Sequence, residues 1–295
     1  DRTSGRIWRL TWRGMDGRAA APTRPYDDLR TEPLEKLAEL LGHANLTVRM
    51  QAMYEMVERG SAAVPLARNL LQQAMAKSQR IHALWVLERL GQLTSRELAA
   101  CRSSPEPEIR VQVCRLLAER PDIQDDERQW LLTCLEAEAP LLRRAAADAL
   151  ARHPHPDSVN PLIRRYRTTD PKDTHLKHTL KMALRDHVRS GAVWQVNLEN
   201  PVVLAEVIPG APDARGAKFL AELRPGLPPP QEVELIAGHG DGMTMESWLR
   251  KVRESREDLP RRLESFHAFR RGLLAARRPW PPSALDWGRE LAKEA

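Results

Sequence analysis

One cationic residue recurs at a nearly constant spacing over the first two thirds of the chain. The five copies stand 31, 30, 33 and 34 residues apart, and they are Arg49, Arg80, Arg110, Arg143 and Lys177. A row of such side chains could bind an anion. We favour a structural role, in which each cation bonds carbonyl groups or an acid of the preceding repeat, although each exposed pair would contribute only about 0.5 kcal/mol.

Two histidine pairs have the spacing of metal ligands. His153 and His155 flank Pro154 in a predicted turn, and His175 and His178 lie three residues apart on a predicted helix. Neither pair has a cysteine or a clear carboxylate nearby in the sequence that could complete a ligand set. We therefore predict no metal site.

The three cysteines are spaced too widely for a metal clip or a heme attachment site. Cys101, Cys114 and Cys134 form no Cys-x-x-Cys motif and no Cys-x-x-Cys-His motif. All three fall within predicted helices, and Cys114 lies on an apolar face. We expect buried, unreacted thiols.

The Gly238–Gly242 segment resembles a phosphate-binding loop only in its glycine content. No buried strand precedes it and no Gly-Lys-Ser/Thr follows it, so we interpret it as a flexible connection between helices. The motifs Gly-x-Ser-x-Gly and His-Glu-x-x-His are also absent from the sequence. The sequence thus predicts no catalytic, cofactor-binding or metal-ligating residue.

A net charge of +6 and a pI near 9.5 permit binding to nucleic acid. The basic residues are, however, spread over every repeat and accompanied by 40 acidic residues, which favours an ordinary solvated surface. Trp85 and Trp130 could stack on bases, but both fall on apolar helix faces and are expected to pack in the core. The chain contains no apolar stretch of the roughly 20 residues that a membrane span requires.

The residues around each recurring cation predict the elements that carry it. In the copy Leu142–Leu150, apolar residues occupy positions 142, 146 and 150, and the other copies repeat this spacing except at Gln79. Such spacing gives one apolar helix face over two turns. Because a two-helix unit of about 30 residues cannot bury this face alone, the sequence predicts an all-α, right-handed α-solenoid of stacked helix pairs.

This pattern divides the chain into four regions. Residues 1–32 combine a strand-like segment, Ser4–Trp12, with a Pro/Gly-rich linker, and residues 33–190 hold five repeats that resemble HEAT repeats. Residues 191–279 are expected to form degenerate helical repeats, and residues 280–295 a tail, a linker or a short helix. The helices expected after residue 191 are Leu198–Val207, Asp213–Leu223, Gln231–Ala237, Met245–Glu254 and Leu259–Arg277.

The order of several short motifs resembles a narrower family. Gly5-Arg-Ile-Trp-Arg-Leu10 is similar to the stretch that ends the β-propeller of PVC-type heme-binding CxxCH proteins, also known as a membrane-bound dehydrogenase family. In those proteins a Pro-rich linker, a Leu-rich opening and an HxNxxVR first repeat follow. Here Leu34–Leu37, His43-Ala-Asn45 and Val48-Arg49 stand in that order, and Leu204–Pro212 looks like a later element.

This resemblance implies an exported or periplasmic protein with a dehydrogenase-like propeller before this segment and a cytochrome c domain, holding heme c, after it. The chain itself lacks Cys-x-x-Cys-His, so no active-site residue is carried over. We expect a non-catalytic scaffold or protein-interaction module, the middle segment of a longer chain, whose partners are proteins or flanking domains.

Two alternatives remain open from the sequence. One is a HEAT-like DNA glycosylase of the alkylpurine type, or another basic solenoid that binds nucleic acid, which predicts salt-dependent binding to duplex DNA. The other is a HEAT-type bilin lyase or adaptor, which predicts a pigment that co-purifies with the protein.

Overall fold

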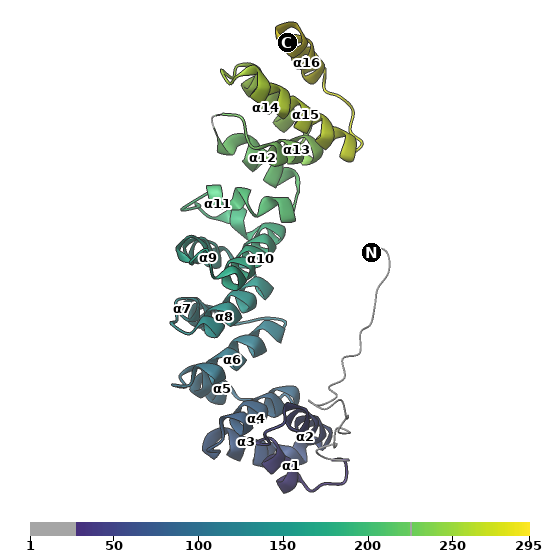
Figure 1. The fold of residues 1–295 in the computed structure, drawn as a ribbon. Coiled ribbons are helices and arrows are strands. Elements are labelled where there is room, and N and C mark those ends of the chain that lie inside the picture. The colour runs from purple at the N-terminus through teal and green to yellow at the C-terminus, as the bar shows by residue number, and fades with distance from the viewer. Residues whose placement is uncertain (1–27, 225) are drawn as a thin grey trace, which may run out of the picture. The chain divides into compact units, whose positions relative to one another are not determined.

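The computed structural model describes residues 28–224 and 226–295 (Figure 1). Within these ranges it contains sixteen α-helices and three short 3-10 helices but no strand. The predicted all-α solenoid fold is therefore confirmed. The strand expected at Ser4–Trp12 lies outside the described residues.

Each of the five expected repeats contains two helices. The pairs are α1 (Leu34–Leu40) with α2 (Leu46–Glu58), α3 (Val64–Gln73) with α4 (Lys77–Arg89), α5 (Ser95–Arg102) with α6 (Pro107–Glu119), α7 (Asp125–Leu135) with α8 (Pro140–Arg152), and α9 (Pro156–Thr168) with α10 (Thr174–Ser190). The described part of the chain divides into two compact units, with the boundary between Glu97 and Leu98.

The first unit has its own apolar core. Leu37 from α1 and Leu41, which directly follows α1, meet Val48 and Met56 from α2, and all four side chains are essentially inaccessible to solvent. Gln79, which interrupts the apolar spacing in the sequence, uses its amide to donate a hydrogen bond of 3.0 Å to the carbonyl of Ala38. Gln79 therefore supplies the hydrogen-bond donor for a carbonyl near the end of α1.

In the second unit the second helices of successive repeats pack on one another. Helix α8 contacts both α6 and α10, and it also packs against α7 of its own repeat. Its buried residues are short or branched: Leu142, Ala146, Ala147, Ala149, Leu150 and Ala151. The alanines allow close approach of neighbouring helices on two sides.

After α10 the regular pairing is interrupted. The helix expected over Leu198–Val207 shortens to α11 (Val202–Ala205), flanked by the 3-10 helices η2 (Ala192–Gln195) and η3 (Ile208–Gly210). Pro201 and Pro209 explain the difference, because proline lacks an amide donor and restricts the residue before it. Longer helices resume with α12 (Ala214–Leu223), α13 (Pro230–His239), α14 (Gly242–Arg253), α15 (Leu259–Ala275) and α16 (Pro282–Glu294).

These last helices pack as α12 with α13, α13 with α15, and α14 with α16. An aromatic cluster joins the final three. The Trp248 and Phe269 rings stack with centroids 5.3 Å apart, and Trp287 meets Trp248 edge-on at 6.0 Å. Residues 282–294 thus form a packed helix. The sequence alone had allowed either a short helix or a tail in this region.

Within the described part of the chain, none of the helices combines the length and the apolar character that crossing a bilayer demands.

The aromatic cluster predicts that α16 is part of the core. Replacing Trp287, which is fully buried, with alanine should lower the free energy of unfolding by about 3–5 kcal/mol. Leu285→Ala is the matched control on the same helix, because Leu285 is 47% exposed and should cost less than about 0.5 kcal/mol. Urea denaturation followed by circular dichroism measures both, and equal effects would show that α16 does not pack as described.

Candidate interaction surface

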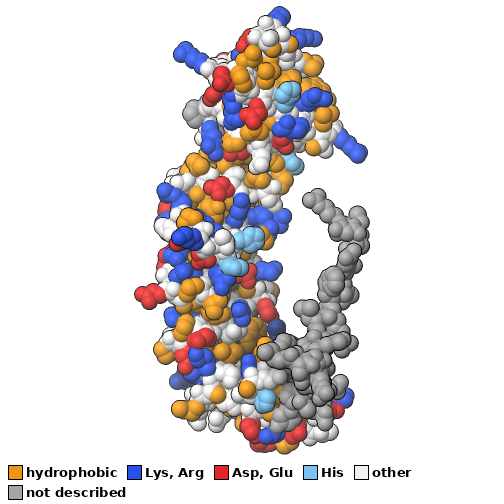
Figure 2. Space-filling model, viewed as in Figure 1, with side chains coloured by type: hydrophobic (Ala, Val, Ile, Leu, Met, Phe, Trp, Pro, Cys, Tyr) orange, Lys and Arg blue, Asp and Glu red, His pale blue; other side chains and the backbone are white. Residues whose placement is uncertain are grey.

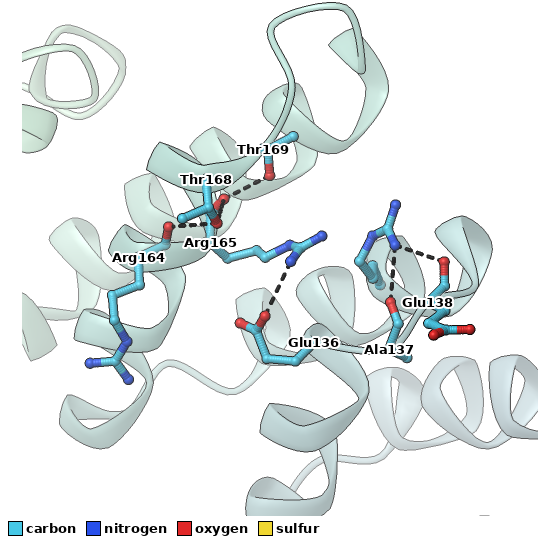
Figure 3. A network of polar contacts seen from close by, with 8 residues as sticks. Glu136, Ala137, Glu138, Arg164, Arg165, Thr168 and Thr169 are labelled. Carbon is cyan, nitrogen blue, oxygen red and sulfur yellow. Dashed lines mark hydrogen bonds and ion pairs between the residues drawn. The ribbon is translucent and has the colours of Figure 1, made fainter.

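Three of the recurring cations bond carbonyls of the segment just before their own helix, either in the turn or in the last turn of the first helix. Arg49 donates to the carbonyls of His43 and Ala44 at 2.7 and 2.9 Å. Arg143 donates to those of Ala137 and Glu138 at 3.0 and 2.8 Å (Figure 3). Lys177 reaches the carbonyl of Tyr166 at 2.6 Å, and its ammonium lies 4.2 Å from the centre of the Tyr166 ring.

The prediction that these cations join each repeat to the preceding one is wrong for Arg49, Arg143 and Lys177. A first helix leaves its last carbonyls without partners inside the helix, and a cation near the start of the second helix lies within reach of them. It therefore fastens the two helices of one repeat. Arg80 holds the matching position on α4, whereas Arg110 lines a cavity of about 570 Å³ with Ala137–Ala139 of the next repeat.

Other arginines, mostly on the first helices, connect successive repeats. Arg68 on α3 pairs with Glu97 on α5 at 2.6 Å, and Arg102 on α5 pairs with Asp126 on α7 at 2.8 Å. Arg165 on α9 reaches back to Glu136, after α7, at 3.1 Å (Figure 3). The charged groups of these helices are thus largely engaged in holding the stack together.

A set of buried glutamates near helix starts was not predicted from the sequence. Glu97 accepts hydrogen bonds from the amide and hydroxyl of Thr94 at 2.9 and 2.7 Å, and Glu127 accepts one from the amide of Gln124 at 2.8 Å. Each carboxylate also meets an arginine from the preceding repeat, Arg68 for Glu97 and Arg120 for Glu127. The spacing Thr94-x-x-Glu97 is a capping-box signal that could have revealed the first of them.

The pKa values of two such glutamates shift in opposite directions. Burial of Glu97 opposes its ionisation, but the hydrogen bonds from Thr94 and Arg68 lower the pKa of its carboxyl. Burial raises the pKa of Glu232, near the start of α13, and its ion pair with Arg224 at 3.1 Å offsets this only in part. Pro229 precedes α13 and supplies no amide or side-chain donor.

All three cysteines are buried, as predicted, and none forms a disulfide. Cys114 on α6 and Cys134 on α7 are close enough to influence each other's ionisation. Their proximity, together with burial, raises the pKa of the Cys114 thiol. Cys114 is therefore protonated at neutral pH and a poor nucleophile.

The histidine pairs of the sequence have separate roles. The His153 ring bonds the carbonyl of Leu117 at 2.8 Å, and the Nδ1 atom of His155 accepts from the amide of Asp157 at the start of α9. His175 and His178 are exposed on α10. Among the described residues, no three or more His, Cys, Asp and Glu side chains are grouped as metal ligands.

Neither tryptophan singled out in the sequence is fully exposed. Trp85 packs against the core cluster of the first unit, and the Arg89 guanidinium lies 5.0 Å from its ring centre. Trp130 on α7 is half-buried. Packing against the protein therefore covers part of the surface of both rings.

The Gly238–Gly242 segment is a tight turn. Gly238 and His239 end α13, and the carboxylate of Asp241 caps α14 by accepting from the amide of Thr244 at 2.7 Å. Arg278 also donates to the carbonyl of Gly240, which joins the turn to the chain after α15. The segment thus connects two helices, as predicted, and these bonds hold it at both ends.

The exposed faces of the second helices in the second unit carry mixed chemistry. Their exposed residues include both charges, histidines and one leucine: Glu108, Arg115 and Glu119 on α6, Leu141, Asp148 and Arg152 on α8, and His175, His178 and Lys181 on α10. Figure 2 shows the same interspersion of blue and red side chains over the visible surface. Such a surface suits contacts with proteins better than tracking of a phosphate backbone.

Comparison with known families agrees with this architecture. The family model of HEAT repeats matches residues 95–185, which extend from the start of α5 into α10. This region consists of HEAT repeats. No curated protein matches the chain.

The contacts of Arg143 predict a local contribution to stability. Arg143→Ala removes two charge-assisted bonds to turn carbonyls and should lower the free energy of unfolding by about 1–2 kcal/mol. Hydrogen exchange should accelerate at the amides of residues 136–139. The adjacent Arg144 makes no hydrogen bond or ion pair within the described residues, so Arg144→Ala should change stability by less than about 0.5 kcal/mol. Equal losses of stability in the two variants would show that the bonds of Arg143 to Ala137 and Glu138 do not stabilise the repeat.

The buried imidazole of His187 predicts acid sensitivity. Its Nδ1 donates to the carbonyl of Ala183 at 2.8 Å, and its Nε2 has no partner among the described residues. Burial lowers the pKa of His187 to about 4, from an ordinary 6.5, and does the same at His82. Between pH 6.5 and about pH 4, the unfolded chain therefore binds a proton at His187 that the folded protein does not bind.

It follows that the stabilising contribution of neutral His187 is complete above pH 6.5 and declines as the pH falls toward 4. Between pH 7 and pH 5, the loss should reach about 2 kcal/mol at most. His187→Asn retains a donor for Ala183 and should be less stable at pH 7 but less sensitive to acid. Urea denaturation over this pH range measures the slope, and an unchanged slope in His187→Asn would assign the acid response to other groups.

Proposed function

We propose that this chain is a non-catalytic scaffold that binds proteins or flanking domains through its stacked helix pairs. The main support is that residues 95–185 match the family model of HEAT repeats, and that the second helices of these repeats expose faces of mixed charge. Stacked repeats present an extended surface of this kind and hold the parts attached to them apart.

We further propose that the scaffold is the middle segment of an exported, multidomain dehydrogenase/cytochrome c-like protein. Support comes from the motif at the first repeat, where His43, Asn45 and Arg49 form one hydrogen-bonded turn. The side-chain oxygen of Asn45 caps α2 by accepting a hydrogen bond of 2.8 Å from the backbone amide of Thr47. The backbone amide of Asn45 donates to Nδ1 of His43 at 3.0 Å. These residues thus build the repeat, and any heme or substrate chemistry would belong to the flanking domains.

The reading frame that encodes this chain provides the first test. We expect β-propeller blades upstream and a Cys-x-x-Cys-His motif downstream. In the parent protein, removal of residues 33–279 should abolish heme reduction by the propeller, because the scaffold positions the two domains. Substrate oxidation with an artificial acceptor and the heme spectrum should persist as controls. Heme reduction that survives the deletion would refute the positioning role.

Binding to nucleic acid is the competing function. It predicts that a fluorescein-labelled DNA duplex gains anisotropy on titration with the chain at low salt, and that this gain disappears as salt rises. We expect no saturable gain, because the basic residues are interspersed with acids. Saturable, salt-sensitive binding would favour the nucleic-acid function over the scaffold.

A further inference from the structure

The second helices of the second unit differ from one another in charge. Helix α6 carries two arginines and two glutamates, whereas α8 and α10 together carry seven lysines and arginines and two aspartates, Asp148 and Asp186. Because α8 and α10 pack against each other, the excess of positive charge lies on adjacent helices. Figure 2 shows histidine and basic side chains close together at the level of α10.

Four of the seven cations on α8 and α10 are engaged within the protein. Arg143 and Lys177 bond carbonyls that precede their own helices. Arg185 and Arg189 lie 3.0 and 3.7 Å from the carboxylate of Asp186. One of the two aspartates is therefore already paired with two arginines.

The other three cations are available to a ligand. Arg144, Arg152 and Lys181 make no side-chain hydrogen bond or ion pair within the described residues, and Arg152 and Lys181 are exposed. Asp148 is exposed as well, and it stands four residues from Arg144 and four from Arg152. Three unpaired cations thus accompany one unpaired acid on these two described helices.

The exposed side chains form one row on each helix. Positions 141, 144, 148 and 152 of α8 follow one another at intervals of three or four, as do positions 175, 178 and 182 of α10, so each set lies along one side of its helix. Equivalent positions of the two repeats are 34 residues apart, which sets 141 beside 175 and 144 beside 178. We call these two rows, together with Lys181, the α8–α10 face.

The α8–α10 face also offers an apolar contact. Leu141, in the first turn of α8, is 55% exposed, and Met182 on α10 is half-buried. Leu141 stands three residues before Arg144, so an apolar side chain and a cation are neighbours on the helix surface. A ligand that carries both an apolar group and negative charge would satisfy both.

We propose that the α8–α10 face binds an acidic segment of a partner protein. The proposal rests on the scaffold function and names one of its contacts. Carboxylates of the partner pair with Arg144, Arg152 and Lys181, and an apolar side chain of the partner packs against Leu141. Charge complementarity sets the class of partner. A phosphate backbone fits less well, because Asp148 would repel it.

The dimensions of the face suit a short segment. Along α8, Arg144 lies about 4.5 Å and Arg152 about 16 Å beyond Leu141, and adjacent helices are about 9 Å apart. An extended chain advances about 3.3 Å per residue, so these distances correspond to roughly two and five residues. The expected segment therefore has an apolar residue followed by acids two to five positions later.

The test uses the chain of residues 1–295 and the fluorescein-labelled peptide Gly-Ser-Leu-Ser-Glu-Glu-Glu-Glu-Ser-Gly. Anisotropy should show saturable binding that weakens as salt is raised, because salt screens exposed charges. Replacing the glutamates with glutamine should weaken binding about tenfold or more, and replacing the leucine with serine about threefold. Absence of binding, or equal binding of the glutamate and glutamine peptides, would overturn the proposal.

Variants of the chain locate the site. Arg152→Gln and Lys181→Gln should each weaken binding about two- to fivefold. Asp148→Asn should strengthen it by a similar factor, because it removes a like charge from the face, and this gain cannot be produced by loss of folding. The control is Arg256→Gln, an exposed cation before α15, which should bind as the unaltered chain does. Equal binding of all four variants would show that the peptide does not bind at the α8–α10 face.

Other ligands give different outcomes. A DNA duplex that binds and is lost in Arg152→Gln and Lys181→Gln, without peptide binding, would overturn the proposal in favour of a phosphate ligand. A dimer in sedimentation that Arg152→Gln dissociates would assign the face to a second copy of the chain. Because the deletion of residues 33–279 tests the scaffold independently, failure of peptide binding alone would leave the scaffold function intact.

Discussion

The structure depends on one constraint: a pair of short amphipathic helices cannot bury its apolar face by itself. Helix α8 illustrates the solution, since it is covered by α6 on one side and by α10 on the other. Its alanines at positions 146, 147, 149 and 151 leave room for both neighbours. The polar contacts then fix angles within this packing: Arg143 holds the two helices of one repeat together, and Arg102 and Arg165 hold successive repeats together.

Much of the fold follows from local sequence, because the period of an amphipathic helix is written in consecutive residues. The leucines and alanines around Arg49 and Arg143 predict both the helices and their pairing. The hydrogen-bond partners of these arginines could not be predicted from the sequence, because a cation at the start of a second helix can reach carbonyls of its own repeat or of the preceding one. Only the geometry of the turn decides that His43 and Ala137 accept the bonds.

The close packing of α13 on α15 was harder to predict than the repeats. It depends on the absence of a side chain at Gly272, because a Cβ atom there would meet the backbone of Glu234. The sequence shows Gly272 as one glycine within an amphipathic helix, where it would ordinarily be unfavourable.

The interruption between α10 and α12 has a consequence for cooperativity. In a stacked array, the stability of each unit is transmitted mainly through its nearest neighbours. Here η2, four residues of α11 and η3 replace a full helix pair, so the energetic coupling across residues 191–213 is weaker than the coupling between α6, α8 and α10. Mechanical load or partial denaturation should therefore open the array at this joint first, leaving the HEAT repeats on one side and the aromatic cluster of Trp248 and Trp287 intact on the other.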